Sequence, residues 1–122
     1  MSGIITPLPR TMPSMRAGKT DGRYIDCTLD LGAVSDSIPN INAASVTIAR
    51  VDGNAITAND LQPAGAAWPN TLDSTKLIPT FGFIAPAGAA GVDYKITITV
   101  NTTTQGRIFV RDVYMSVVNA LG

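Results

Sequence analysis

The sequence predicts an all-β protein built as one domain, and three observations support this. All nine acidic residues are Asp and only three of the nine basic residues are Lys, so the long charged side chains that favour helices are scarce. Several segments alternate apolar and polar residues with the period of two that is typical of half-buried strands. A chain of 122 residues has room for one hydrophobic core.

Residues 1–22 differ from the rest of the chain and predict an extended N-terminal arm. The segment contains three prolines and follows neither the helical nor the strand period. Prolines hold a backbone extended, so the arm could reach beyond a small domain, and a flexible tail is the alternative. Its apolar content exceeds what a solvated tail needs, which favours docking. The expected partner-binding residues are Ile4, Ile5, Leu8, Arg10, Met12, Met15, Arg16 and Lys19.

Residues 23–122 predict a β-sandwich of six or seven strands. The first alternating segment is Tyr24–Leu31, which makes Cys27 a core residue. The clearest hairpin closes the chain, with one strand at Tyr94–Val100 and a long strand at Arg107–Val118. The alternation assigns ten residues to the core: Cys27, Leu29, Val46, Ile48, Tyr94, Ile96, Ile98, Val113, Met115 and Val117.

A further strand is expected at about residues 43–51, followed by the turn dipeptide Asp52-Gly53. Both residues tolerate the positive φ of a tight hairpin turn, so a short partner strand is expected at residues 54–57.

Two irregularities modify the strand predictions. Pro79 interrupts the strand expected at Leu77–Ile84 and predicts a sheet edge, because proline cannot donate to a ladder. In the last strand the apolar phase changes between Val110 and Val113. A one-residue slip reverses the buried face, so we expect a β-bulge near Arg111, or a strand that changes sheets.

The composition argues against an enzyme. The chain has no His, which removes the commonest general base and metal ligand. One cysteine can form neither an intrachain disulfide nor a thiolate zinc site. Asp26 and Asp30 share a strand face at a separation of about 13 Å, too far for the paired carboxylates of a glycosidase. We expect no catalytic residues, no cofactor and no metal.

The charge balance also limits the partners. Nine basic residues offset nine acidic ones, so bulk charge draws the chain neither to nucleic acid nor to an anionic membrane. Prolines and Arg10 interrupt the N-terminal apolar residues, so no signal peptide is expected, and no stretch has the length of a membrane span. A single cysteine fits a protein assembled in reducing cytoplasm.

The order of residues in the first and last strands follows a recognisable pattern. Its motifs are Gly91-x-x-Tyr94 with alternating Ile and Thr, Thr103-x-x-Gly106-Arg107, and Arg111-Asp112-Val113-x-Met115-x-Val117, preceded by Tyr24 to Leu31, Ser37-Ile38 and Ser45 to Ile48. Over about residues 24–118 this pattern resembles the small tailed-bacteriophage virion proteins called fibre-tail adaptors. This chain departs from the family in two ways. The tryptophans expected after the first strand are missing, and the basic segment before Tyr24 is longer than the pattern needs. The resemblance implies an immunoglobulin-like β-sandwich, present in many copies, that joins larger virion components.

Two classes of function remain open. The first is a virion assembly module whose partners are tail, fibre or capsid subunits, with capsid decoration as the nearest variant of a fibre adaptor. The second is a carbohydrate-binding module for host recognition, in which Trp68, Tyr24, Tyr94 and Tyr114 would stack on sugars. An exposed Trp68 would also suit a protein contact, and its alternative role is a lid over the core. Aromatic residues make up only 6% of the chain and are scattered, which favours the first class.

Overall fold

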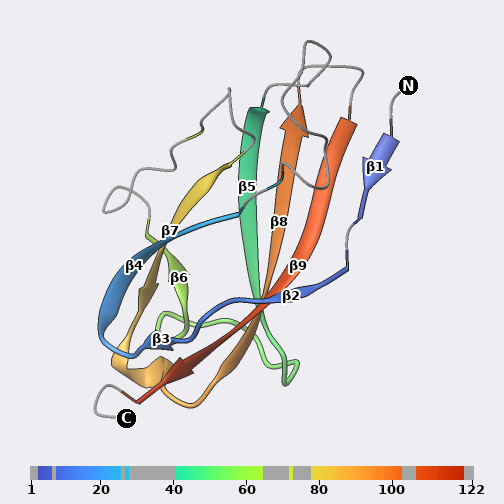
Figure 1. Ribbon diagram of the computed structural model, residues 1–122. Helices are drawn as coiled ribbons and strands as arrows, with labels where there is room; N and C mark the ends of the chain where they lie inside the picture. Colours follow the sequence, from blue (N-terminus) through green and yellow to red (C-terminus); the bar gives the residue numbers. More distant parts are fainter. Residues whose placement is uncertain are drawn as a thin grey trace.

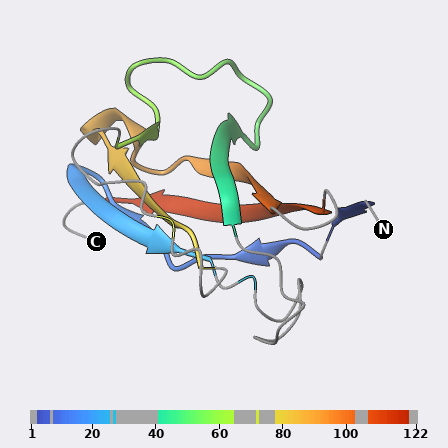
Figure 2. The same ribbon diagram turned by 90° about the horizontal axis from the view of Figure 1, so that it is seen from above.

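The computed structural model folds the chain into two facing β-sheets (Figures 1 and 2). It describes residues 3–6, 8–25, 27, 41–64, 72, 78–102 and 107–119. Within these ranges there is no α-helix, and one 3-10 turn, η2 (Ala87–Ala89), precedes β8. The all-β prediction is therefore confirmed.

The larger sheet is centred on the C-terminal hairpin. Strands β8 (Asp93–Thr102) and β9 (Arg107–Val118) pair antiparallel, and β5 (Ile41–Arg50) pairs antiparallel with the other side of β8. Tyr94 lies opposite Met115 in this hairpin. The hairpin predicted from the alternation is confirmed, with β8 extending slightly beyond the predicted strand at each end.

The smaller sheet has the order β4-β7-β6, with β4 (Lys19–Tyr24) and β6 (Gln62–Pro63) antiparallel to β7 (Thr80–Ala85). The prediction that Pro79 places this strand at a sheet edge is wrong, because β7 is the central strand. Pro79 directly precedes the strand, so its missing N–H costs no ladder hydrogen bond.

The N-terminal segment lies along β9 as three short parallel strands: β1 (Gly3–Ile5), β2 (Arg10–Thr11) and β3 (Met15–Arg16) (Figure 1). We call these strands the N-terminal edge. Arg10 lies six positions after Ile4, whereas their partners on β9, Ile108 and Val113, are five positions apart. The N-terminal segment therefore has one extra residue between β1 and β2. A second extra residue falls between β2 and β3, where five residues of this segment oppose four of β9. Prolines lie in both intervals, and each extra residue reverses the side-chain phase.

The structure thus does not confirm a separate arm at residues 1–22. The described part of this segment belongs to the domain's own sheets, and β4 crosses the predicted boundary at residue 22. The prolines and phase changes removed the periodicity that would have predicted a strand. Pairing with β9 also required a partner about 100 residues away in the sequence, which no local pattern specifies.

A tight crossover carries the chain from the larger sheet to the smaller one. The Ala17 N–H donates to the Val118 carbonyl oxygen at 2.9 Å, and the Gly18 N–H donates to the Ala85 carbonyl oxygen at 2.6 Å. Gly18 has φ +81°, a conformation that favours glycine. Both sheets are therefore bonded to the two residues between β3 and β4.

The hairpin predicted at Asp52-Gly53 is wrong in part. The chain does turn there, with Gly53 at φ +86°, but residues 54–57 form no strand. The Asn54 N–H donates to the Asp52 carboxylate at 2.9 Å, which closes the turn locally. The chain then crosses to β6 of the smaller sheet.

The predicted irregularity in β9 is also wrong, because the pairing of β9 with β8 has no register shift and stays in one sheet. Alternate residues from Phe109 to Val117 face the core throughout, and Arg111 is one of them, with 6% exposure. Its guanidinium carbon lies 5.3 Å from the centroid of the Phe109 ring. The aliphatic part of the Arg111 side chain therefore fills a core position. In the sequence alone, this charged residue interrupts the alternation.

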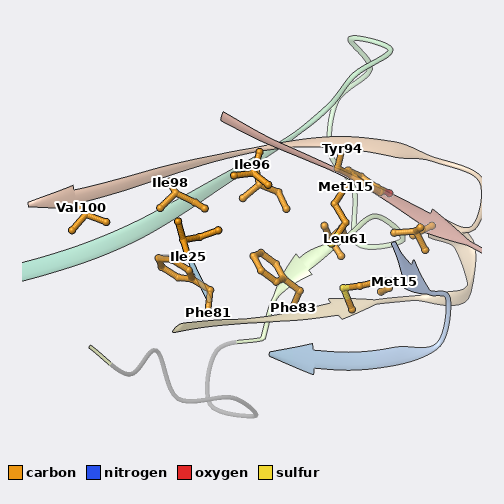
Figure 3. Close-up of a cluster of buried hydrophobic side chains, with 14 of the residues drawn as sticks. Met15, Ile25, Leu61, Phe81, Phe83, Tyr94, Ile96, Ile98, Val100 and Met115 are labelled. Atoms are coloured by element: carbon orange, nitrogen blue, oxygen red, sulfur yellow. The ribbon is translucent and has the colours of Figure 1, made fainter. Parts of the chain in front are cut away.

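One hydrophobic core fills the space between the two sheets (Figure 3). Residues of β8, including Ile96 and Ile98, face Phe81 and Phe83 of β7. Seven of the ten predicted core residues are buried: Cys27, Tyr94, Ile96, Ile98, Val113, Met115 and Val117. Val46 and Ile48 are only partly buried, because β5 lies at the edge of its sheet. Leu29 lies outside the described residues. The alternation missed Met15, Leu61, Phe81, Phe83 and Phe109, which are also buried.

We expect the N-terminal segment to contribute to stability through Met15. Met15→Ala should lower the free energy of unfolding by about 2–5 kcal/mol, because the side chain has no exposed surface. Leu8→Ala is the control, with an expected change of about 0.5 kcal/mol or less at a side chain that is 85% exposed. Urea denaturation measures both, and equally small effects would contradict the placement of Met15 in the core.

Candidate interaction surface

The predicted partner-binding residues divide into anchors and exposed side chains. Met15 is buried and Met12 packs against the core, so both attach the segment to its own domain. Ile4 and Leu8, by contrast, are 67% and 85% exposed. The exposed basic residues are Arg10 in β2, Arg16 in β3 and Lys19 in β4. Ile5 lies in β1 opposite Phe109. Trp68 lies outside the described residues.

Next to the N-terminal edge, a cavity of ≈ 320 Å³ lies between β2 and β4. Apolar side chains, including Met12 and Val113, line part of it, and Arg10, Arg23 and Tyr24 also contribute to its lining. Tyr24 is 67% exposed, so its ring is accessible from solvent. The lining of the cavity therefore combines apolar side chains with an aromatic ring and positive charge.

Arg23 joins β4 to the segment between β2 and β3. Its Nη2 donates to the Ser14 carbonyl oxygen at 3.3 Å and to the Asp21 carboxylate at 3.4 Å. Its Nε is buried and has no hydrogen-bond partner within the described residues. Guanidinium groups bind carboxylates well, so acidic groups suit this surface. The sequence indicated Arg10 and Met12 but not Arg23, because the β2 and β4 segments meet only after the chain crosses between sheets.

A polar network centred on Asp60 lies where the loop after β5 meets β8. Asp60 has 2% exposure and accepts hydrogen bonds from the Tyr94 hydroxyl at 2.7 Å, Arg50 Nη1 at 3.0 Å and the Thr57 N–H at 2.9 Å. Arg50 also donates through Nη2 to Asp52 at 2.7 Å. The network holds residues 51–61 against the sheet, and no local pattern predicted it, because its members come from three separate segments.

The hydrogen bonds and burial in this network shift the pKa values of its members. The hydrogen bond from Tyr94 is the main cause that holds the pKa of Asp60 below its ordinary value. The hydrogen bond from Arg50 lowers the pKa of Asp52 in the same way. Burial, followed by the hydrogen bond to Asp60, raises the pKa of Tyr94 to about 12. The network therefore consists of carboxylates held ionised and a phenol held neutral.

The other described carboxylates also have partners within the protein. The Ser116 hydroxyl donates to Asp93 at 2.6 Å, the Thr97 hydroxyl donates to Asp112 at 2.8 Å, and Asp21 pairs with Arg23. Among the residues that the structure describes, no three His, Cys, Asp or Glu side chains gather as metal ligands. Nor does that part of the chain contain a helix long and apolar enough to cross a membrane.

No protein-family model matches the sequence, and no curated protein shows significant similarity to it.

We expect the hydroxyl of Tyr94 to stabilise the fold. Tyr94→Phe should lower the free energy of unfolding by about 1–3 kcal/mol, because it removes a donor from a buried carboxylate. Tyr114→Phe is the matched control at a partly exposed ring, with an expected change within about 0.5 kcal/mol. Urea denaturation at neutral pH measures both, and similar values for the two variants would contradict a stabilising role for the buried hydroxyl.

The same network makes stability depend on pH. The pKa of Asp60 is lower in the folded than in the unfolded chain, so its contribution is present above about pH 4 and is lost as the pH falls further. The difference in stability between the wild type and Tyr94→Phe should therefore shrink in acid. Denaturation curves at about pH 7 and about pH 3 measure this, and a difference that grows in acid would contradict the assignment.

Proposed function

We propose that the protein is a non-enzymatic structural protein of a bacteriophage virion, an adaptor that joins tail and fibre components. The observation that carries the proposal is the N-terminal edge, which is fixed to β9 but leaves Ile4 and Leu8 exposed. Ile4 lies in β1 and Leu8 lies between β1 and β2, and apolar side chains exposed on a segment that pairs with the sheet suit a protein contact better than solvent. The resemblance to fibre-tail adaptors adds the virion as the setting.

The topology supports an immunoglobulin-like β-sandwich. In that fold the strands are ordered A-B-E-D in one sheet and C-F-G in the other. When β4 to β9 are lettered B to G in chain order, the order β4-β7-β6 becomes B-E-D and the order β5-β8-β9 becomes C-F-G. Tyr94 lies near the start of β8, as a tyrosine does near the start of strand F in immunoglobulin domains, which supports the proposal. Its hydroxyl here binds the side chain of Asp60.

The proposed adaptor works through a rigid body and one contact surface. The N-terminal edge and the adjacent cavity lie on the same side of the domain, since β2 borders both. A tail or fibre subunit would cover Ile4 and Leu8 and place an acidic group near Arg10. Many copies assembled in the host cytoplasm would form the joint, without nucleic acid, membrane or cofactor. Capsid subunits are the partners in the nearest variant, a decoration protein.

A carbohydrate-binding module for host recognition is the second candidate. It is favoured by one observation, the exposed ring of Tyr24 beside Arg10 and Arg23 in the lining of the cavity. Aromatic rings stack on sugar faces while polar groups bind the hydroxyls. Glycan binding by the isolated protein, lost in Tyr24→Ala, would favour this candidate over the adaptor.

Incorporation of variants into particles tests the proposal. The double substitution Ile4→Asp and Leu8→Asp should leave the purified domain folded, because both side chains are exposed, and should prevent its incorporation. Val118→Asp, at the opposite end of β9, is the matched control and should incorporate normally. Immunodetection in purified particles measures incorporation. Normal incorporation of the double variant would exclude the N-terminal edge as the contact surface.

A further inference from the structure

Four sheet edges are formed by the described strands, and β5 is the one whose only protective feature is a register shift at its first residues, between Ile41 and Ala43; from Ala43 onward it pairs regularly with β8. Natural proteins protect such edges with proline, charged residues or very short strands. Prolines interrupt the N-terminal edge, β4 carries Lys19, Asp21 and Arg23, and β6 is two residues long and includes Pro63. Strand β5 is ten residues long and contains no proline.

Strand β5 also lacks free charge. Its single charged residue is Arg50, at its last position, and Asp52 and Asp60 bind that guanidinium at 2.7 and 3.0 Å. The residues that point away from the core are small and exposed: Ala43, Ser45 and Thr47. None of the described side chains of β5 would therefore block or repel a second strand at this edge.

The apolar side chains of β5 are incompletely covered. Val46 and Ile48 face the core but are only partly buried, whereas Ile98 and Ile96, their partners on β8, are at most 1% exposed. Val51, directly after the strand, is 54% exposed. Figure 1 shows β5 on the side of the larger sheet opposite β1. Pairing along this edge would bury apolar surface in addition to forming backbone hydrogen bonds.

We propose that β5 is a dimer interface, at which the β5 strands of two copies pair antiparallel across a two-fold axis. In this arrangement each copy presents the same edge to the other, so the strand has to be compatible with itself. A strand without free charge meets this condition, because the two copies do not repel each other. The two larger sheets then form one continuous sheet. The proline-interrupted N-terminal edge opposes head-to-tail extension of that sheet, so the assembly closes as a dimer rather than growing into a fibre. The inference rests on β5 alone and is independent of the proposed virion function.

Sedimentation of the full chain over a concentration series tests the dimer. We expect the wild type to dimerise below about 100 μM, within the range of weak specific interfaces. Thr47→Lys places two like charges near each other at the paired edges and should raise the Kd at least about tenfold. Thr11→Lys, on β2 at the opposite edge of the same sheet, is the matched control and should leave the Kd unchanged. Ser45→Lys, also at an exposed position, replaces Thr47→Lys if that variant does not fold.

Two sedimentation outcomes would overturn the proposal: a wild type that stays monomeric up to about 100 μM, or a dimer that Thr47→Lys leaves intact. Amide hydrogen exchange at low and high protein concentration locates the interface independently. Alternate amides of β5, those not bonded to β8, should exchange more slowly in the dimer. Slowing confined to the N-terminal edge would also overturn the proposal, because it would place the contact there.

Discussion

The pairing of β9 along both of its edges is the constraint on which the rest of the structure depends. On one edge β9 forms the hairpin with β8, and on the other it binds the three short strands of the N-terminal segment. This second pairing buries Met15 and places Ala17 and Gly18 where they bond to both sheets. The entry of the chain into β4, and thus the smaller sheet, follows from it.

The same pairing determines which surfaces are available for contacts. Ile4 and Leu8 lie outside the core on this side of the domain, and the cavity beside β2 forms where the N-terminal edge faces β4. At the far side of the sheet, β5 pairs on one edge only among the strands that the structure describes. One side of the domain therefore presents exposed side chains, and the other presents a strand backbone with small neutral side chains.

The Asp60 network connects the loop after β5 to the core. A carboxylate that is almost completely buried requires donors, and Tyr94, Arg50 and Thr57 supply them. Because Arg50 belongs to the end of β5, the network also neutralises the only charge on that strand. A stabilising feature of the fold thus contributes to the uncharged character of the β5 edge.

The sequence by itself determined the all-β class, the C-terminal hairpin and most of the core on β8 and β9. These features depend on alternation within one strand and on pairing with the next strand along the chain, so local residues specify them. For the candidate site, the sequence indicated Ile4, Leu8 and Arg10, but it did not indicate that Met15 is a core anchor or that Arg23 lies beside them.

Only the tertiary structure decided where the N-terminal segment lies, that β7 is central, that Arg111 faces the core and that Asp60 binds Tyr94. Each of these depends on a contact between residues that are distant in the chain or on a phase change at proline. Local periodicity carries no information about such pairings, because the partner strand, and not the segment itself, determines which side chains are buried.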